Sequence, residues 1–266
     1  MRNLTNANRI VVKVGTSVLT NPNGTLNENL IKQLADVLAA LRKSGKTVSL
    51  VTCGAIPAGI TKLRLPFYPN DMKSKQAAAA VGQSMLMSLY DKCFGRHGIS
   101  VAQLLLTKYT VQRDDSLANV TNTINALFGL GVIPIINEND PIITDEIKLG
   151  DNDALAAHVA NIIYADLLII LTNVDGLYSK NPKTSGARII PEVSTITDEI
   201  KAAANFSKKE VKHGSGGMLT KISAAVMASK SGTKTLILNG YNPKIILDAL
   251  KGAPVGTYFD IKRYKN

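Results

Sequence analysis

Residues 148–153, Lys-Leu-Gly-Asp-Asn-Asp, place a glycine, an amide and two carboxylates directly before an alanine-rich helical pattern. The free N–H groups at the start of a helix attract anions. Asp and Asn are also the residues that most often cap a helix. Taken alone, this segment favours capping, and an active-site role for its carboxylates needs support from elsewhere in the chain.

Two lysines give that support. Lys13 stands in a run of valine and isoleucine, where an unpaired buried ammonium would be costly. We expect it to reach the end of its strand and meet an anion; the alternative is an edge-strand lysine that points to solvent. Residues 213–221, His-Gly-Ser-Gly-Gly-Met-Leu-Thr-Lys, form a glycine-rich loop that enters a helix. This pattern predicts phosphate binding by backbone N–H groups, with Lys221 one turn into the helix.

Small polar residues follow three more predicted strands. These loops contain Thr52-Cys53-Gly54, Asn137-Glu138-Asn139-Asp140 and Thr172-Asn173. Gly54 permits a positive φ or a close approach of backbone to a ligand. Because the loops after parallel strands lie along one edge of a sheet, we expect these groups to form one site with the two lysines.

The elements that would position this site follow from hydrophobic patterning. Nearly continuous apolar runs, typical of strands buried on both faces, occur at 10–14, 47–51, 101–106, 132–136, 167–171 and 235–238. Helical patterns lie at about 26–41, 75–94, 114–128, 151–163, 197–204, 217–230 and 243–250. This alternation predicts an α/β fold, a three-layer αβα sandwich with a mainly parallel open sheet.

Composition narrows the class of ligand. The chain has 266 residues and a net charge of +11, which is compatible with nucleic acid or with small anionic substrates. The lysines are scattered, Trp is absent and aromatics are 5%, so we favour small anions and expect no nucleic-acid partner. No apolar run suits a signal peptide or membrane span, and the two isolated cysteines fit a reducing compartment, so we expect a cytoplasmic protein.

Several common motifs are absent or incomplete. Gly45-Lys46-Thr47 resembles the end of a P-loop, but Ala40 stands where the first glycine is required and the segment runs from helix to strand. No GxGxxG follows a strand. The histidines occupy unrelated settings and no cluster has metal-ligand spacing, so we predict no metal site formed by side chains.

With these residues in view, the chain resembles the amino acid kinase family and, within it, the glutamate 5-kinases. The resemblance extends from about Arg9 to about Phe259. Aspartokinases, acetylglutamate kinases and UMP kinases resemble the chain in the glycine-rich loops but differ at 13–20, 137–141 and 148–153. The family is indicated by the Lys13 strand, by 172–178 with Asn181-Pro182 and by 214–221; the glutamate 5-kinases are indicated by 13–20, 137–141 and 148–153.

The resemblance implies ATP- and Mg²⁺-dependent phosphorylation of the side-chain carboxylate of L-glutamate, the first step of proline biosynthesis. Mg²⁺ would be bound mainly through the nucleotide phosphates. A homo-oligomer and feedback inhibition by proline are also implied. One alternative is a sibling kinase that acts on another carboxylate or phosphate acceptor. Another is a non-catalytic amino-acid sensor, which the presence of Lys13, Asp153 and Lys221 disfavours.

Residue roles carry over by motif. Lys13 and Lys221 would flank the transferred phosphoryl group and Asp153 would orient them. The carboxylate of Asp140 would accept the substrate ammonium, and Asp151 is expected to cap the helix. The full glutamate site is Cys53, Gly54, Asn137, Asp140 and Asn152; the nucleotide site is Lys13, Gly15, Thr172, Asn173, Ser215, Gly216, Gly217, Met218 and Lys221.

Three features depart from the resemblance. Cys53 stands where serine is usual, which predicts a thiol in the glutamate site that alkylating reagents reach. On the nucleotide side, Asn173 and Asn181 stand where aspartate is common. We also expect a single domain over 1–266, with glutamate bound by about 1–165, nucleotide bound by about 166–266, and no C-terminal PUA domain.

Overall fold

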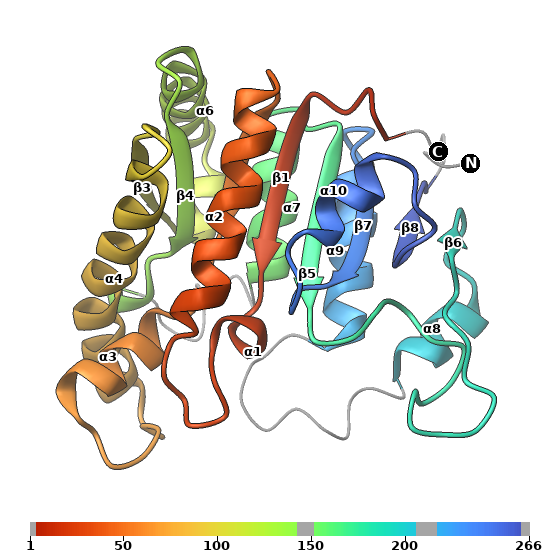
Figure 1. Ribbon diagram of the computed structural model, residues 1–266, viewed down its shortest axis with the longest axis horizontal. Helices are drawn as coiled ribbons and strands as arrows, with labels where there is room; N and C mark the ends of the chain where they lie inside the picture. The colour runs from red at the N-terminus through yellow and green to blue at the C-terminus, as the bar shows by residue number, and fades with distance from the viewer. Residues whose placement is uncertain (1–3, 143–151, 206–216, 262–266) are drawn as a thin grey trace.

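The computed structural model describes residues 4–142, 152–205 and 217–261, which build one sheet flanked by helices (Figure 1). The strands are β1 (Arg9–Val14), β2 (Thr47–Val51), β3 (Val101–Leu106), β4 (Ile133–Glu138), β5 (Leu167–Thr172), β6 (Glu192–Val193), β7 (Lys234–Asn239) and β8 (Thr257–Phe259). Their order in the sheet is β3-β4-β2-β1-β5-β7-β8-β6. Every pairing is parallel except that of β7 with β8.

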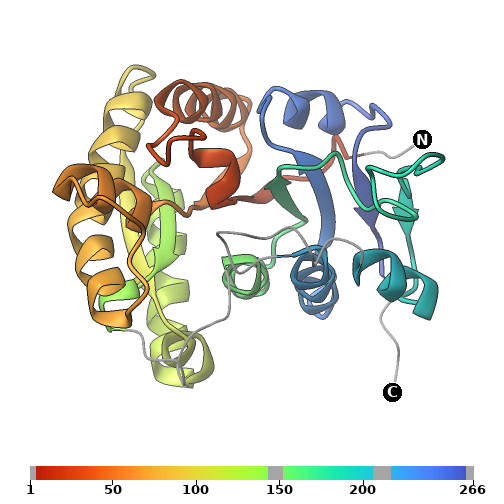
Figure 2. The same cartoon turned by 90° about the horizontal axis from the view of Figure 1, so that it is seen from below.

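Helices cover both faces of the sheet (Figure 2). They are α1 (Thr16–Leu19), α2 (Glu28–Lys43), α3 (Ala55–Leu63), α4 (Met72–Gly95), α5 (Lys108–Gln112), α6 (Asp114–Gly129), the 3-10 helix η1 (Asp140–Ile142), α7 (Asn152–Ile162), α8 (Asp198–Asn205), α9 (Met218–Ser229) and α10 (Ile245–Leu250). One hydrophobic core lies between the sheet and α2, α4 and α10, and the other between the sheet and α6, α7, α8 and α9. The predicted α/β sandwich is thereby confirmed.

The alternation of side chains along β1 decides where its lysine points. Ile10, Val12 and Val14 belong to the core beneath α2, whereas Val11 belongs to the core beneath α7 and α9. Since successive residues of a strand face opposite sides, Lys13 lies on the α7 and α9 side. β1 is central in the sheet and Lys13 is 4% exposed, so the solvent-facing alternative for this lysine is wrong.

The chain reverses its direction across the sheet at β1. After β1 the chain forms β2, β3 and β4 on one side of that strand, and it then forms β5 and β7 on the other side. A parallel sheet binds ligands at such a switch point, outside the carboxyl ends of its strands. Lys13 lies near the end of β1 and Thr172 ends β5, so the fold brings both to this crevice.

One predicted boundary needs correction at the site itself. We expected the fourth strand to end at Ile136, but β4 continues through Asn137 and Glu138. These two residues pair in register with Leu105 and Leu106 of β3, which extends equally far. Both are buried, so Asn137 projects from a rigid strand rather than from a loop.

The pattern also missed α3, which contains a proline and a glycine. Pro57 lies in the first turn, where its missing N–H is tolerated. A Cβ added to Gly59 would lie 1.8 Å from the backbone oxygen of Ala78, and one added to Gly82 would lie 1.9 Å from that of Ala55. Both glycines are therefore required for the close contact between α3 and α4.

Two further predictions concern segments away from the site. Lys46, in the segment that resembled a P-loop, donates hydrogen bonds to the carbonyl oxygens of Thr5 and Ala7 at 3.0 and 2.6 Å. This lysine therefore ties down the N-terminal segment. Across the described residues, no helix is both long and apolar enough to cross a membrane.

Candidate active site

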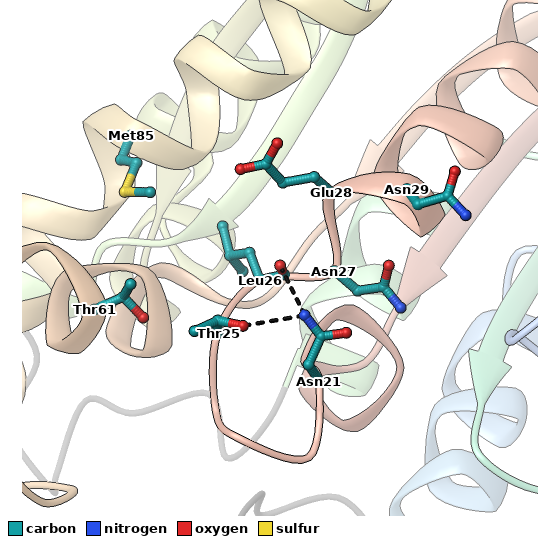
Figure 3. Close-up of a pocket in the computed structure, with 8 residues that line it drawn as sticks. All are labelled: Asn21, Thr25, Leu26, Asn27, Glu28, Asn29, Thr61 and Met85. Carbon is teal, nitrogen blue, oxygen red and sulfur yellow. Dashed lines mark hydrogen bonds between the residues drawn. The ribbon is translucent and has the colours of Figure 1, made fainter.

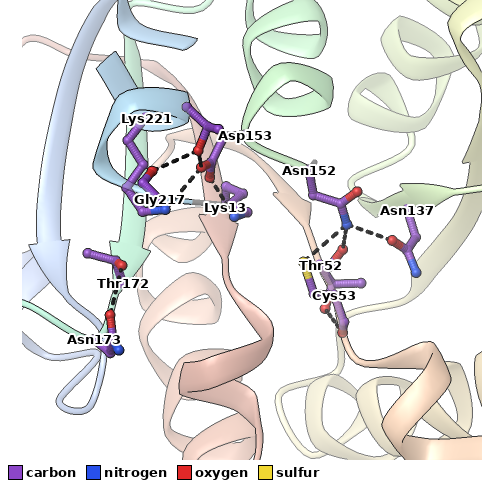
Figure 4. Close-up of polar contacts among 11 residues, drawn as sticks. Lys13, Thr52, Cys53, Asn137, Asn152, Asp153, Thr172, Asn173, Gly217 and Lys221 are labelled. Carbon is purple, nitrogen blue, oxygen red and sulfur yellow. Dashed lines mark hydrogen bonds and ion pairs between the residues drawn. The ribbon is translucent and has the colours of Figure 1, made fainter. Parts of the chain in front are cut away.

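A buried carboxylate joins two lysines from opposite ends of the chain. Asp153, in the first turn of α7, is 2.5 Å from Lys13 Nζ through Oδ1 and 3.0 Å from Lys221 Nζ through Oδ2. Thr220 also donates to Oδ2, at 2.9 Å. Figure 4 shows Lys13, Asp153 and Lys221 converging from β1, α7 and α9. We call Lys13, Asp153, Thr220 and Lys221 the lysine cluster.

The charges in the lysine cluster stabilise one another. Asp153 is fully buried, and Lys13 and Lys221 are 4% and 5% exposed. Burial alone would raise the pKa of Asp153, but the charges and hydrogen bonds of both lysines outweigh it and hold that pKa well below its usual range. The group is therefore ionised at neutral pH, and it carries one negative charge between two ammonium groups. A bound anion would compensate the excess positive charge.

A second group of polar side chains begins one residue away. Asn152 precedes Asp153, and its Nδ2 lies 2.8 Å from Asn137 Oδ1 and 3.2 Å from Cys53 Sγ. The same nitrogen donates to the carbonyl oxygen of Thr52 at 2.5 Å. With Gln83, which contacts Asn137, these residues form the amide cluster, defined as Thr52, Cys53, Gln83, Asn137 and Asn152. Figure 4 shows Thr52, Cys53, Asn137 and Asn152 beside the lysine cluster. The two clusters offer neutral donors and acceptors next to a cationic centre.

Cys53 and Gly54 connect β2 to α3. Burial raises the pKa of the Cys53 thiol, although the charge of Lys13 opposes this effect. The thiol therefore serves at neutral pH as a weak neutral partner of Asn152 and not as a thiolate. Gly54 has φ +103°, in the left-handed region, where it immediately precedes α3. The expected positive φ at this glycine is confirmed.

The residues predicted to bind nucleotide lie around the ends of β1, β5 and the start of α9. Gly15 N donates to the Leu171 carbonyl at 3.2 Å, which joins the loop after β1 to β5. Thr172 is buried, whereas Asn173 is exposed, and their side chains are in contact at 3.4 Å. Gly217 lies immediately before α9.

The side chain of Met218 does not line this site. It is 5% exposed and belongs to the core beneath α7 and α9, because it occupies the inward face of the first turn of α9. Only its backbone can serve a nucleotide. Ser215, Gly216 and Asp151, with residues 148–150, lie outside the described residues.

Asp140 lies in η1, the short helix that follows β4 and packs against α4. Its carboxylate is half-buried. Burial, with a smaller contribution from the nearby Asp140, raises the pKa of the Tyr68 hydroxyl. The structure thus places the Asp140 side chain just after the end of β4, and its role toward the substrate ammonium stays a prediction.

The sequence predicted Thr220 only as part of the segment 215–221, and it did not predict Gln83. Thr220 contacts Asp153, and its position directly before Lys221 in a glycine-rich loop was the available signal. Gln83 on α4 accepts a hydrogen bond from Asn137 Nδ2 at 2.9 Å. It stands in an alanine-rich helix with no accompanying polar motif, so the sequence around it carried no signal.

Other parts of the described chain offer less chemistry. No group of three or more His, Cys, Asp or Glu in these residues could hold a metal ion. A pocket of about 480 Å³ lies beside the start of α2 (Figure 3). Its Asn21 donates to Thr25 and to the Leu26 carbonyl, and Asn27 accepts from Leu30 N. These side chains hold their own loop, and we assign no ligand to this pocket.

Comparison with known proteins places this geometry in a family. The amino acid kinase family matches residues 8–239, so the chain belongs to that family. A glutamate 5-kinase from Listeria welshimeri is 47% identical, over 98% of this chain and 95% of that protein. A glutamate 5-kinase from Geobacter sulfurreducens is 46% identical, over 96% of this chain and 68% of that protein.

Solved structures agree on the fold. A carbamate kinase from Giardia lamblia bound to AMP-PNP is 18% identical and has a TM-score of 0.67, over 97% of this chain and all of that one. An isopentenyl phosphate kinase from T. acidophilum is 19% identical with a TM-score of 0.66, over 94% and 99% of the two chains. At this identity the likeness concerns the fold alone.

Proposed function

We propose that this protein transfers the γ-phosphoryl group of ATP to the side-chain carboxylate of L-glutamate, the first step of proline biosynthesis. The observation that carries the proposal is the junction of the lysine and amide clusters at Asn152-Asp153. Close identity to glutamate 5-kinases over nearly the whole chain supports the choice of acceptor. The junction joins a centre for the phosphoryl group to neutral groups suited to an amino acid.

The lysine cluster acts on charge. Phosphoryl transfer requires that the reactants be aligned and that negative charge on the moving group be neutralised. Lys13 and Lys221 flank the transferred group, and Asp153 holds the two ammonium groups in place. The nucleophile is the substrate carboxylate, which is ionised at neutral pH with an ordinary pKa of about 4.3. No general base is needed.

Each side of the site binds one substrate. Cys53, Gly54, Asn137 and Asn152 contact glutamate, and Asp140 accepts its ammonium group. The nucleotide lies along Gly15, Thr172, Asn173 and the segment 215–221, so glutamate is bound mainly by about 1–165 and nucleotide by about 166–266.

Mg²⁺ would be held mainly by the nucleotide phosphates, where it would supply charge screening. Both carboxylate oxygens of Asp153 already accept hydrogen bonds from the lysine cluster, so this group serves the lysines rather than the metal. We further propose that the protein is a cytoplasmic homo-oligomer that proline inhibits at or near the glutamate site.

The test is ADP formation with four acceptors: glutamate, aspartate, acetylglutamate and UMP. Turnover with glutamate alone supports the proposal, and turnover only with another acceptor would identify a sibling kinase. The variant Lys221→Ala should abolish turnover while the protein stays folded. Its matched control is Lys230→Ala, at the exposed end of the same helix, which should keep normal activity. Near-normal activity of Lys221→Ala would refute the role of the lysine cluster.

A further inference from the structure

Gln83 presents a buried amide nitrogen to the amide cluster. Its side chain projects from α4, the residue is 7% exposed, and its Oε1 accepts from Asn137 Nδ2 at 2.9 Å. Its Nε2 is buried and has no hydrogen-bond partner among the described residues. Because a buried donor without an acceptor is destabilising, such a group in a binding site indicates a ligand that supplies the acceptor.

The direction of the hydrogen bonds fixes which atom of Gln83 is left over. The carbonyl oxygen of Thr52 can only accept, so Asn152 must turn its Nδ2 toward it. Asn152 Nδ2 also meets Asn137 Oδ1, which accepts from the Glu138 backbone N–H as well. Asn137 Nδ2 then faces Gln83 and must find an oxygen there. The series of amides thus ends in the NH₂ group of Gln83.

The backbone holds Gln83 in this position. Its neighbour Gly82 touches α3 so closely that an added Cβ would lie 1.9 Å from the oxygen of Ala55. η1, which contains Asp140, packs against α4 as well. The unsatisfied NH₂ group of Gln83 and the carboxylate of Asp140 are therefore carried by two elements that are in contact, α4 and η1.

We propose that Gln83 is a specificity-determining residue whose Nε2 donates a hydrogen bond to the α-carboxylate of the amino-acid substrate. The inference rests on the proposed function, which puts the side-chain carboxylate beside Lys13 and Lys221. The α-carbon of the substrate then lies toward Gln83, at the end of the amide series away from the lysines. Its ammonium group needs an acceptor there, and its α-carboxylate needs a donor. Asp140 accepts from the ammonium group, and Gln83 donates to the carboxylate.

The test reverses the polarity of this one contact. In Gln83→Glu, one carboxylate oxygen still accepts from Asn137 Nδ2, while the other replaces the donor and repels an α-carboxylate. The substrates are glutamate and its α-amide, which keeps the reacting side-chain carboxylate. Loss of a hydrogen bond to a charged group predicts that the preference for glutamate over the α-amide, as a ratio of kcat/KM, falls about tenfold or more. The KM for ATP should stay within about twofold of wild type.

Two further variants complete the design. Gln83→Met removes the donor without adding charge and should lower the same preference, which keeps the test decisive if Gln83→Glu does not fold. Gln103→Glu makes the matched change at an exposed position of β3 and should leave the preference unaltered. An unchanged preference in a folded Gln83 variant would overturn the inference. Failure of the wild-type protein to phosphorylate glutamate would instead overturn the proposed function.

Discussion

Replacing Asp153 by asparagine tests the electrostatics of the lysine cluster without changing its size. Asparagine keeps one oxygen for one lysine, but it turns an NH₂ group toward the other ammonium. Both lysines remain at least nine-tenths buried, and neither retains the carboxylate charge. We expect a large loss of stability even without substrates.

The size of the loss follows from burial. Removing one partner of a buried ion pair destabilises a protein by about 3–5 kcal/mol. For a chain of this length that corresponds to a fall in Tm of about 6–20 °C. Adding Lys221→Met to Asp153→Asn removes one uncompensated ammonium, so the double variant should be more stable than Asp153→Asn alone.

The measurement is urea unfolding at neutral pH without nucleotide. Asp36→Asn serves as the matched control, since this carboxylate is 45% exposed and pairs with His97 at the surface. Its free energy of unfolding should stay within about 0.5 kcal/mol of wild type. If Asp153→Asn were within about 1 kcal/mol of wild type, Asp153 would not be the ionised partner of two buried lysines.

Three more outcomes follow. The pKa of Asp153 lies below its unfolded value of about 3.9, so the contribution of this carboxylate to folding stability is complete above that pH and is lost as pH falls toward the folded pKa. In acid unfolding, the difference in stability between wild type and Asp153→Asn should therefore shrink below about pH 4. A constant difference would contradict this. Gly82→Ala should lower stability by about 1–3 kcal/mol and raise the KM for glutamate more than that for ATP, because its Cβ meets Ala55; unchanged stability would disprove the close contact. Burial raises the pKa of Cys53, so mass spectrometry should find it alkylated by iodoacetamide more slowly than glutathione, and slower still with glutamate; no protection by glutamate would place the thiol outside the site.

The fold was largely predictable because its central strands are buried on both faces. Each of these strands is a short apolar run, and the predicted bounds of β2 and β3 match the structure. β6 and β8 have two and three residues, too few for any period to register. α3 was hidden by Pro57 and Gly59, whose compatibility with a helix depends on its contact with α4.

The lysine cluster was predictable for a different reason. Its members lie near the end of a strand or in the first turn of a helix, and these ends meet at one edge of the sheet, so the order of elements alone brings them together. Gln83 had no such signal. It lies in the middle of α4, and its partner Asn137 is 54 residues further along the chain, in a position that the sequence assigned to a loop. Only the contact of α4 with the sheet edge brings these two amides together.

The adjacency of Asn152 and Asp153 has a consequence for how the two substrates would be held relative to each other. Consecutive Cα atoms are about 3.8 Å apart across a trans peptide bond, and that spacing does not depend on side-chain packing. A displacement of α7 would therefore move Asn152, which contacts glutamate, and Asp153, which pairs with the lysines, by the same amount. The backbone of α7 would thus keep a fixed distance between the group that binds glutamate and the group that orients the lysines at the phosphoryl group. Holding two substrates at a fixed distance is a source of high effective molarity.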